Sequence, residues 1–256
     1  MDWKSKITKV EPNHLVTKGY KQEDLIGNIS FSHVVYLLLK DKLPSKEHGK
    51  MMDAILTACI DHGVTPPSAM ASRIVASGGV PLPTAVAAGV LSIGDAHGGA
   101  IEKGAKFLQD GVLRAKKGGK TIKDMARILV SEKREKKERI LGYGHRVHSS
   151  DPRTKRLFSL ANELNITKDH IKLSKEIEKE LEAQLGKTLP INVDGAIAAI
   201  ISDMDFDWRL GKGFFLIGRV AGLTAHVYEE KKDFKKMRKI FSAEVDYDGP
   251  SEKELP

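Results

Sequence analysis

Three glycine-containing segments carry polar side chains that could do chemistry. His97 precedes two glycines, His145 follows a Gly-Tyr-Gly stretch, and Asp194 lies in an Asn-Val-Asp-Gly segment. Two histidines and a carboxylate suit proton transfer next to a carbonyl: the carboxylate exchanges a proton with carbon, and the histidines stabilise charge on oxygen. Each segment taken alone also fits a plain structural role, which for His97 is a turn and for Asp194 the N-cap of a helix.

Two arginines could bind substrate carboxylates. Arg219 lies in the apolar stretch 214–223, where an unpaired charge is costly, so it must meet a carboxylate or phosphate of the protein or of a ligand. Arg153 follows Asp151 and a proline, a setting that is also common for surface arginines at the start of a helix. Because guanidinium groups bind carboxylates in bidentate fashion, the whole set suits acid–base chemistry on a polycarboxylate.

Helices must position these residues, because apolar residues recur with the helical period and no long alternating strand pattern occurs. The predicted fold class is therefore all-α or nearly so. The first 20 residues are expected to form an extended entry or hairpin, and the tail from Phe241 to be loosely ordered. The Ala- and Gly-rich helix at Thr84–Ile93 suits a tight buried interface. Helices are expected at about 30–44, 47–59, 66–74, 84–93, 100–109, 121–137, 153–164, 169–185, 193–204 and 214–227.

The composition excludes several classes of protein. With 256 residues, 41% hydrophobic and 30% charged, the chain can bury a large core and is not generally disordered. No apolar run approaches the roughly 20 residues of a membrane helix, and the N-terminus lacks the apolar core of a signal peptide. Cys59 is the only cysteine, so a cytoplasmic setting is expected. The net charge of +8 favours anionic partners without choosing among nucleic acids, phosphates and carboxylates.

The order and spacing of five motifs resemble those of the citrate synthase superfamily. The resemblance runs from about Gly19 to Arg238, although the chain is about a third shorter than a typical citrate synthase. It is most similar to the short citryl-CoA lyases and to the citrate-synthase-like C-terminal module of ATP-citrate lyase. The motifs are His97-Gly-Gly, Gly142-Tyr-Gly-His145-Arg, Asp151-Pro-Arg153, Asn192-Val-Asp194-Gly and Gly218-Arg219.

The resemblance implies a two-domain helical fold and a role for each site residue. The large domain is expected at 1–97 and 204–256, and a small mobile domain at 98–203, which closes to exclude water. Asp194 resembles the catalytic carboxylate, His97 the histidine at the thioester carbonyl, and His145 the histidine at the oxaloacetate carbonyl or citryl hydroxyl. The residues that resemble binders of substrate carboxylates are His62, Arg153, Arg219 and, as a cation from the partner subunit, Lys235 or Arg238.

The resemblance also implies a coenzyme A thioester as substrate, with no permanently bound cofactor and no metal. The backbone of Gly142, Tyr143 and Gly144 resembles the family's adenine contact. The segment from Arg114 to Arg139 holds 11 Lys and Arg against 4 Asp and Glu, which indicates either a solvated helical face or a site for coenzyme A phosphates. His148 and His226 are not assigned; His226 fits a core or interface position.

The resemblance implies a citryl-CoA lyase that cleaves citryl-CoA to acetyl-CoA and oxaloacetate, as a homodimer or larger homo-oligomer. The resemblance leaves room for a partner citryl-CoA synthetase. The alternative enzyme is a citrate synthase, which would also hydrolyse citryl-CoA. A basic nucleic-acid-binding protein is disfavoured because the basic segment lacks interleaved aromatic residues. A catalytically silent subunit is disfavoured because His97, His145 and Asp194 occur together.

Overall fold

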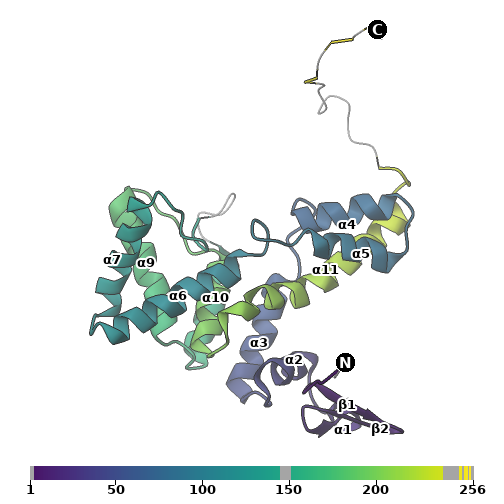
Figure 1. Ribbon diagram of the computed structural model, residues 1–256, viewed down its shortest axis with the longest axis horizontal. Helices are drawn as coiled ribbons and strands as arrows, with labels where there is room; N and C mark the ends of the chain where they lie inside the picture. The colour runs from purple at the N-terminus through teal and green to yellow at the C-terminus, as the bar shows by residue number, and fades with distance from the viewer. Residues whose placement is uncertain (1–2, 145–150, 239–247, 250, 253, 255–256) are drawn as a thin grey trace. The chain divides into compact units, whose positions relative to one another are not determined.

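The computed structural model describes residues 3–144, 151–238, 248–249, 251–252 and 254 (Figure 1). His145, His148 and most of the tail from Phe241 lie outside the described residues. Within the described part, eleven α-helices and three short strands confirm the predicted, nearly all-α class. Among these residues, no helix combines the length and the apolar character needed to cross a membrane.

Along the described chain, three strands come first and the α-helices follow, with a short 3₁₀ helix before the last of them. The strands are β1 (Thr8–Glu11), β2 (His14–Thr17) and β3 (Tyr20–Lys21). The helices are α1 (Gln22–Leu25), α2 (Phe31–Lys40), α3 (Lys46–Cys59), α4 (Pro67–Ser77), α5 (Leu82–Leu91), α6 (Ala100–Lys117), α7 (Ile122–Glu135), α8 (Pro152–Glu163), α9 (Asp169–Leu185), α10 (Val193–Asp203), η1 (Trp208–Leu210) and α11 (Gly211–Asp233).

The N-terminal strands form an antiparallel sheet in the order β1-β2-β3. Thr8 lies opposite Thr17 in the first pair, and Val16 lies opposite Lys21 in the second. The expected hairpin is therefore confirmed and carries a short third strand.

Helix α6 is eight residues longer than the prediction, which ended it at Gln109. Gly111 lies inside the helix instead of ending it. A Cβ at Gly111 would lie 2.8 Å from Leu129 Cδ1 and 2.9 Å from Leu173 Cδ2. The glycine thus allows α7 and α9 to pack closely on α6, and a packing glycine and a terminating glycine look alike in a single sequence.

The described chain forms two compact units, Met1–His62 with Ile93–Gly222, and Gly63–Ser92 with Leu223–Pro256. These boundaries differ from the predicted domains at 1–97 with 204–256 and at 98–203. That prediction concerned parts that move in catalysis, and it stays a prediction.

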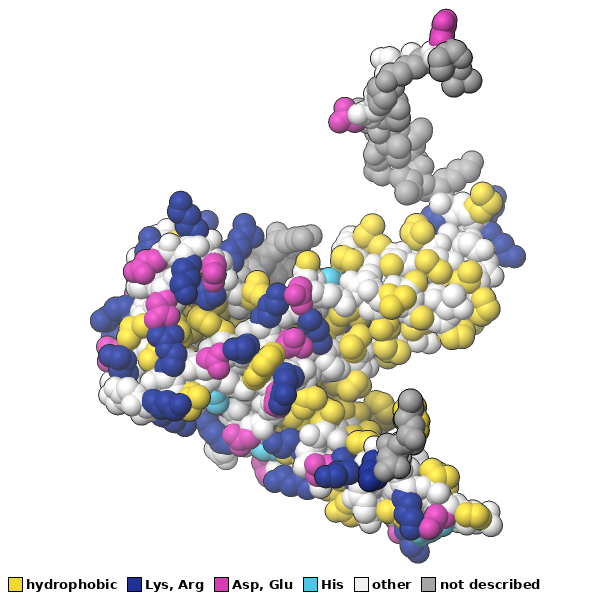
Figure 2. All heavy atoms as spheres, viewed as in Figure 1, with side chains coloured by type: hydrophobic (Ala, Val, Ile, Leu, Met, Phe, Trp, Pro, Cys, Tyr) yellow, Lys and Arg dark blue, Asp and Glu magenta, His cyan; other side chains and the backbone are white. Residues whose placement is uncertain are grey.

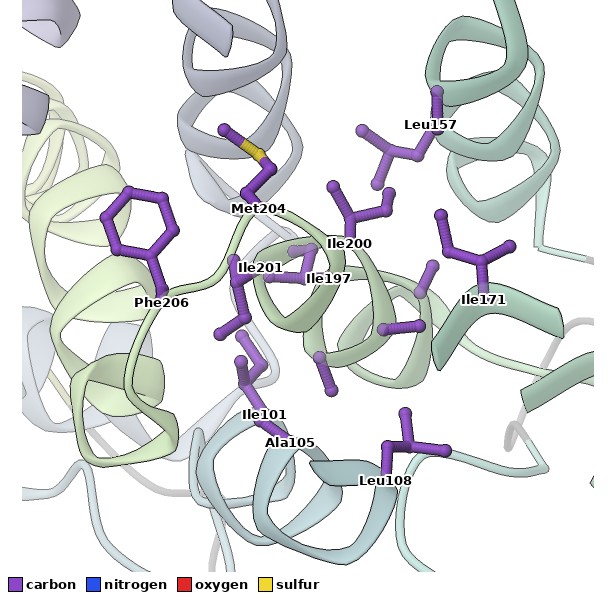
Figure 3. Close-up of a cluster of buried hydrophobic side chains, with 14 of the residues drawn as sticks. Ile101, Ala105, Leu108, Leu157, Ile171, Ile197, Ile200, Ile201, Met204 and Phe206 are labelled. Carbon is purple, nitrogen blue, oxygen red and sulfur yellow. The ribbon is translucent and has the colours of Figure 1, made fainter. Parts of the chain in front are cut away.

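Helix α10 is at the centre of the core of the first unit. Every residue from Gly195 to Asp203 is buried. Ile197, Ile200 and Ile201 pack among side chains of α6, α8 and α9 (Figure 3). The large hydrophobic cluster fixes the position of α10, and with it the position of Asp194 in the first turn of this helix.

In the second unit, α4 and α5 approach closely at Gly89. A Cβ there would lie 2.0 Å from Ser72 Oγ and 2.7 Å from the Ser68 carbonyl oxygen. The small residues of the segment predicted as a tight interface are thus used in part within the chain. Leu91, at the end of α5, remains 86% exposed.

Candidate active site

Asn192 is the N-cap of helix α10, so the carboxylate of Asp194 is not needed for capping. Asn192 Oδ1 accepts hydrogen bonds from the backbone N–H groups of Asp194 and Gly195, both at 3.1 Å. Its Nδ2 donates to the carbonyl oxygen of Gly144 at 2.8 Å. The plain explanation of Asp194 as the N-cap is therefore wrong, because the residue two positions earlier fills that role.

The loop at Gly142–Gly144 is bound to the segment that leads into α10. The N–H of Asn192 donates to the Gly142 carbonyl at 3.0 Å, and the N–H of Gly144 donates to the Pro190 carbonyl at 2.7 Å. Gly142 has φ +90°, and a Cβ at Gly195 would lie 2.3 Å from the Gly142 oxygen. Both glycines are needed for this close approach, so the loop helps to place Asp194.

Tyr143 points into the protein. Its hydroxyl donates to the Ser174 carbonyl at 3.0 Å, and burial raises the pKa of the phenol well above its ordinary value. The predicted adenine contact through the backbone of residues 142–144 remains a proposal. The Gly144 N–H is already used in its bond to Pro190, whereas the Gly142 carbonyl oxygen, which accepts from Asn192, can accept a second hydrogen bond.

The surroundings of Asp194 favour a proton on its carboxyl group. Burial raises the pKa of this carboxyl, and the charge of Asp151 raises it further. The guanidinium groups of Arg153 and Arg219 oppose that rise. Desolvation is the larger effect, so the acid form persists to higher pH than in an ordinary aspartate. A carboxyl whose charged form is disfavoured in this way is suited to proton transfer.

His97 is presented by a short turn before α6. The backbone groups of Gly94 and His97 exchange two hydrogen bonds, at 2.9 and 3.2 Å. Between them, Asp95 pairs with Lys103 at 3.0 Å and with Lys212 at 2.7 Å. These two cations lower the pKa of Asp95 to about 2, so it remains a charged anchor of the turn.

One aromatic ring contacts both His97 and Arg219. The ring of Phe215 lies 5.5 Å from the His97 ring in an edge-on arrangement, and 4.6 Å from the Arg219 guanidinium. A Cβ at Gly98 would lie 2.8 Å from Phe215, which explains the glycine after the histidine. Burial, with the nearby charge of Arg219, lowers the pKa of His97, so its neutral form dominates near pH 7. A neutral imidazole can donate one hydrogen bond to a carbonyl oxygen.

Arg219 is buried, with only 3% of its surface exposed. Its Nε donates to the Cys59 carbonyl at 2.9 Å, while its Nη1 is buried and has no partner among the described residues. Burial lowers its pKa, and the charges of Asp61 and Asp194 act in the opposite direction. Of the two alternatives for Arg219, a ligand carboxylate fits the unpaired nitrogen.

Arg153 begins α8 and forms a fork with Asp151, the N-cap of that helix. Its Nε lies 3.1 Å from Oδ1, and its Nη2 lies 2.8 Å from Oδ2. Asp151 is only 2% exposed and also accepts the Arg153 N–H at 2.9 Å. The guanidinium of Arg153 is thus oriented by the N-cap of its own helix.

For the other predicted residues, the structure gives the unit to which each belongs and its exposure or ion pairs. His62 belongs to the first unit and is exposed, in the segment after α3. Lys235 and Arg238 belong to the second unit, where Lys235 is exposed. Arg238 makes a bidentate pair with Glu230, at 2.7 and 2.6 Å. His226 is partly buried, with Nδ1 3.9 Å from Glu229, in keeping with a structural position.

The basic segment of α6 and α7 is largely a surface of mixed charge (Figure 2). Arg114 makes a bidentate pair with Glu132 at 2.9 and 2.5 Å. Further pairs join Lys133 to Glu138 at 2.5 Å and Lys116 to Asp169 at 3.4 Å. These contacts favour the solvated-face interpretation for the paired cations, and phosphate binding remains a proposal for the rest.

A pocket of about 290 Å³ is lined by residues around the start of α8 and the segment before α10. It shares Asp151 with the Arg153 pair and Ile191 with the segment before the α10 cap. Its lining residues are Asp151, Thr154, Lys155, Phe158, Lys175, Glu178, Lys179, Pro190 and Ile191. Its three lysines outnumber the carboxylates of Asp151 and Glu178, which favours a negatively charged group over a positive one. No group of three potential metal-binding side chains occurs in the described ranges.

Sequence reasoning did not identify Phe215, or the orienting roles of Asp151 and Asn192. The four-residue spacing of Phe215 and Arg219 on a helix was an available signal, since such pairs are neighbours on one face. Contact between Phe215 and His97 joins residues 118 positions apart and carries no local signal.

Comparison with known proteins identifies the family of the chain. The family described as "Citrate synthase, C-terminal domain" matches residues 44–240. The chain belongs to the citrate synthase family. The solved citryl-CoA lyase from Hydrogenobacter thermophilus is 48% identical, with a TM-score of 0.91 over 99% of this chain and 97% of that one. The predicted citrate-synthase-like helical fold and the stated resemblance are thus confirmed.

More distant relatives share the fold over part of their length. ATP citrate lyase from Methanothrix soehngenii, solved with citrate and coenzyme A, is 24% identical, with a TM-score of 0.85 over 98% of this chain and 42% of that one. The probable ATP-citrate synthase of Dictyostelium discoideum is 27% identical over 89% of this chain and 36% of its own length. The 2-methylcitrate synthase of Shewanella oneidensis is 29% identical over 91% of this chain and 58% of its own length. The chain therefore spans only about a third of the length of the ATP-citrate synthases it matches.

Proposed function

We propose that this protein is a citryl-CoA lyase, which cleaves citryl-CoA to acetyl-CoA and oxaloacetate. The observation that carries the proposal is the 48% identity to a citryl-CoA lyase over nearly the full length of both chains. The site supports it, because His97, Asp194, Arg153 and Arg219 lie in one unit and act on one another electrostatically.

Cleavage begins at the citryl hydroxyl in this proposal. His145 accepts the hydroxyl proton, and the carbon–carbon bond breaks to leave oxaloacetate and the enolate of acetyl-CoA. His97 donates a hydrogen bond to the thioester oxygen, where the negative charge develops. The carboxyl of Asp194 then delivers its proton to the enolate carbon. The lowered pKa of His97 and the raised pKa of Asp194 both favour these protonation states.

Carboxylate binding falls to the arginines, with His62 as a further contact. Arg219 offers a buried Nη1 that has no hydrogen-bond partner in the described part of the chain, and Asp151 holds the guanidinium of Arg153. Coenzyme A enters as part of the substrate. Its adenine is proposed to contact the loop at 142–144, and the lysine-lined pocket is proposed to receive one of its charged groups.

A homodimer or larger homo-oligomer forms part of the proposal. Large apolar side chains of the second unit are exposed, as the hydrophobic surface over α4 and α5 in Figure 2 illustrates. They include Met70 (53%), Leu91 (86%) and Tyr228 (61%). Burying such a surface between two copies is favourable. Either Lys235 or Arg238 of a partner subunit would then complete the carboxylate site; Arg238 must first exchange its pair with Glu230.

Subunit mixing tests the shared site. An inactive His97→Ala subunit is combined with an inactive Arg238→Ala or Lys235→Ala subunit. Mixed dimers contain one complete site, so partial activity is expected. Confirmed heterodimers without activity would argue for a site within one chain.

Incubation with citryl-CoA tests the function itself. Malate dehydrogenase with NADH reports oxaloacetate, and a thiol reagent reports free CoA; Asp194→Asn protein provides the background of uncatalysed hydrolysis. A lyase yields oxaloacetate with little free thiol. The match to the 2-methylcitrate synthase favours a citrate synthase as second candidate. A dominant thiol signal with little NADH consumed would support that alternative. A citryl-CoA synthetase is the proposed source of the substrate.

A further inference from the structure

Two glycines one helical turn apart bring α11 unusually close to the end of α3. A Cβ at Gly222 would lie 2.1 Å from the Ile60 carbonyl oxygen. A Cβ at Gly218 would lie 2.7 Å from the Leu56 carbonyl oxygen and 2.7 Å from Cys59 Cβ. The obstacles are mostly backbone atoms, which cannot rotate away. Any larger residue must therefore push the two helices apart.

This close approach determines where Arg219 sits. Arg219 follows Gly218 directly, and its Nε donates to the Cys59 carbonyl at 2.9 Å. That carbonyl belongs to the last turn of α3, the same turn that the glycines contact. On its other side the guanidinium lies 4.6 Å from the Phe215 ring. The Cys59 carbonyl and the Phe215 ring thus hold the guanidinium, and no described residue is a hydrogen-bond partner of Nη1.

A glycine inside a helix needs a reason, because glycine weakens a helix interior relative to alanine. Gly213, on the same helix, meets nothing within 4 Å of a built Cβ. Gly218 and Gly222 differ from it in facing backbone at distances that exclude a side chain. Glycine occupies these two positions although alanine would stabilise the α11 helix by itself.

We propose that Gly218 and Gly222 are positioning residues that set the depth of Arg219 in the carboxylate site. The inference rests on the proposed function, since it takes Arg219 as a binder of the substrate. Alanine at position 222 would shift the helices by about 1 Å, and a misplacement of that size can cost roughly 100-fold. The shift would stretch the bond to Cys59 and move Nη1 away from the substrate carboxylate.

Binding of oxaloacetate by calorimetry tests the proposal on the full-length protein. For Gly222→Ala the dissociation constant should rise roughly 10- to 100-fold. Gly218→Ala should show a smaller rise, and it serves where Gly222→Ala does not fold. Gly213→Ala is the matched control; it should bind like wild type and melt at an equal or higher temperature. In cleavage of citryl-CoA, KM should rise more than kcat falls, because a ground-state contact is lost.

A double-mutant cycle separates positioning from a general structural effect. In an Arg219→Leu background, Gly218→Ala should weaken binding no further, because the group that it positions is gone. Equal weakening in both backgrounds would overturn the proposal, as would wild-type affinity in Gly218→Ala and Gly222→Ala. A wild-type protein that fails to bind oxaloacetate would overturn the proposed function, and this inference with it.

Discussion

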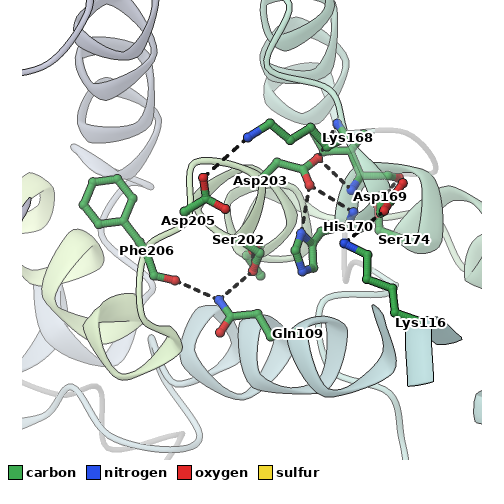
Figure 4. Close-up of polar contacts among 12 residues, drawn as sticks. Gln109, Lys116, Lys168, Asp169, His170, Ser174, Ser202, Asp203, Asp205 and Phe206 are labelled. Carbon is green, nitrogen blue, oxygen red and sulfur yellow. Dashed lines mark hydrogen bonds and ion pairs between the residues drawn. The ribbon is translucent and has the colours of Figure 1, made fainter. Parts of the chain in front are cut away.

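Helix α10 carries an aspartate at each end, and the two differ in their hydrogen-bond partners. Asp203, at the last turn, is fully buried and well satisfied (Figure 4). It accepts the backbone N–H groups of Lys168, His170 and Ile171 at 2.7, 3.0 and 3.1 Å, and it lies 2.8 Å from His170 Nδ1. In this way it caps helix α9 and ties that helix to α10.

Asp194, at the first turn, is surrounded quite differently. Asn192 takes the capping bonds, and burial raises the pKa of the Asp194 carboxyl. The same helix thus holds one carboxylate that accepts the capping hydrogen bonds of α9 and one whose charged form is destabilised by burial. A carboxyl in the second state is suited to moving a proton, and the difference could not be read from residue type.

Two buried arginines repeat the contrast. Arg73 is 8% exposed and pairs with Glu229 at 2.7 Å and with Glu230 at 2.8 Å. Arg219 is 3% exposed and contacts a carbonyl and a ring, and its Nη1 has no hydrogen-bond partner among the residues that the structure describes. Arg73 is joined to two carboxylates, as expected of a structural ion pair. Arg219 has a nitrogen to spare in the described part of the chain, as expected of a group that binds a ligand.

The largest effect is expected from Asp194→Asn. Cleavage of citryl-CoA should slow by about 10²–10⁴-fold, because the acid is lost while shape is kept. The free energy of unfolding should stay level or rise, since Asn192 keeps the cap and a poorly solvated carboxyl is removed. Single-turnover kinetics and urea unfolding measure the two quantities. A folded variant with near-normal turnover would refute the role of Asp194.

Asp203→Asn should show the reverse pattern. The free energy of unfolding should fall by about 2–4 kcal/mol, because buried N–H groups of α9 lose a charged acceptor. Turnover per folded molecule should change only a few-fold. Urea unfolding checks stability, and activity is normalised to the folded fraction. A variant as stable as wild type would show that the Asp203 contacts contribute little.

Arg219→Leu should weaken oxaloacetate binding by about 1.5–3 kcal/mol, the size of a charge-assisted hydrogen bond. Arg219→Lys should restore only part, because the planar fork is lost. Arg153→Leu should weaken binding similarly. The control, Arg114→Leu, removes a surface pair with Glu132 and should leave affinity unchanged. The carboxylate-site proposal fails if both site variants bind oxaloacetate as tightly as wild type in calorimetry.

The smallest effect is a pH dependence of stability. The folded-state pKa of Asp194 is raised, so between the ordinary aspartate pKa and the raised one the folded state binds more protons than the unfolded state. Asp194 therefore makes unfolding easier as pH rises through that window. Asp194→Asn should remove this slope, which urea unfolding across the window can measure. Parallel curves for wild type and variant would mean that the carboxyl is not perturbed.

Much of the fold could be predicted from the sequence, and several candidate site residues could be named, because their signals are local. Helical periodicity gave the long helices, and the glycine-bordered segments pointed to His97 and Asp194. The close contacts across the chain were not predictable. Gly111 could be understood only beside Leu129 and Leu173, which lie on other helices. Asn192 and Asp194 could each cap a helix, and only geometry decided between them.

Exchange of the methyl protons of acetyl-CoA in D₂O, with oxaloacetate present, tests the central claim most directly. It reports proton transfer at carbon, the step assigned to Asp194. Wild type should exchange these protons measurably by NMR, and Asp203→Asn should do so per folded molecule at a similar rate. Folded Asp194→Asn should exchange them at least about 100-fold more slowly. Exchange by Asp194→Asn at the wild-type rate would contradict the account.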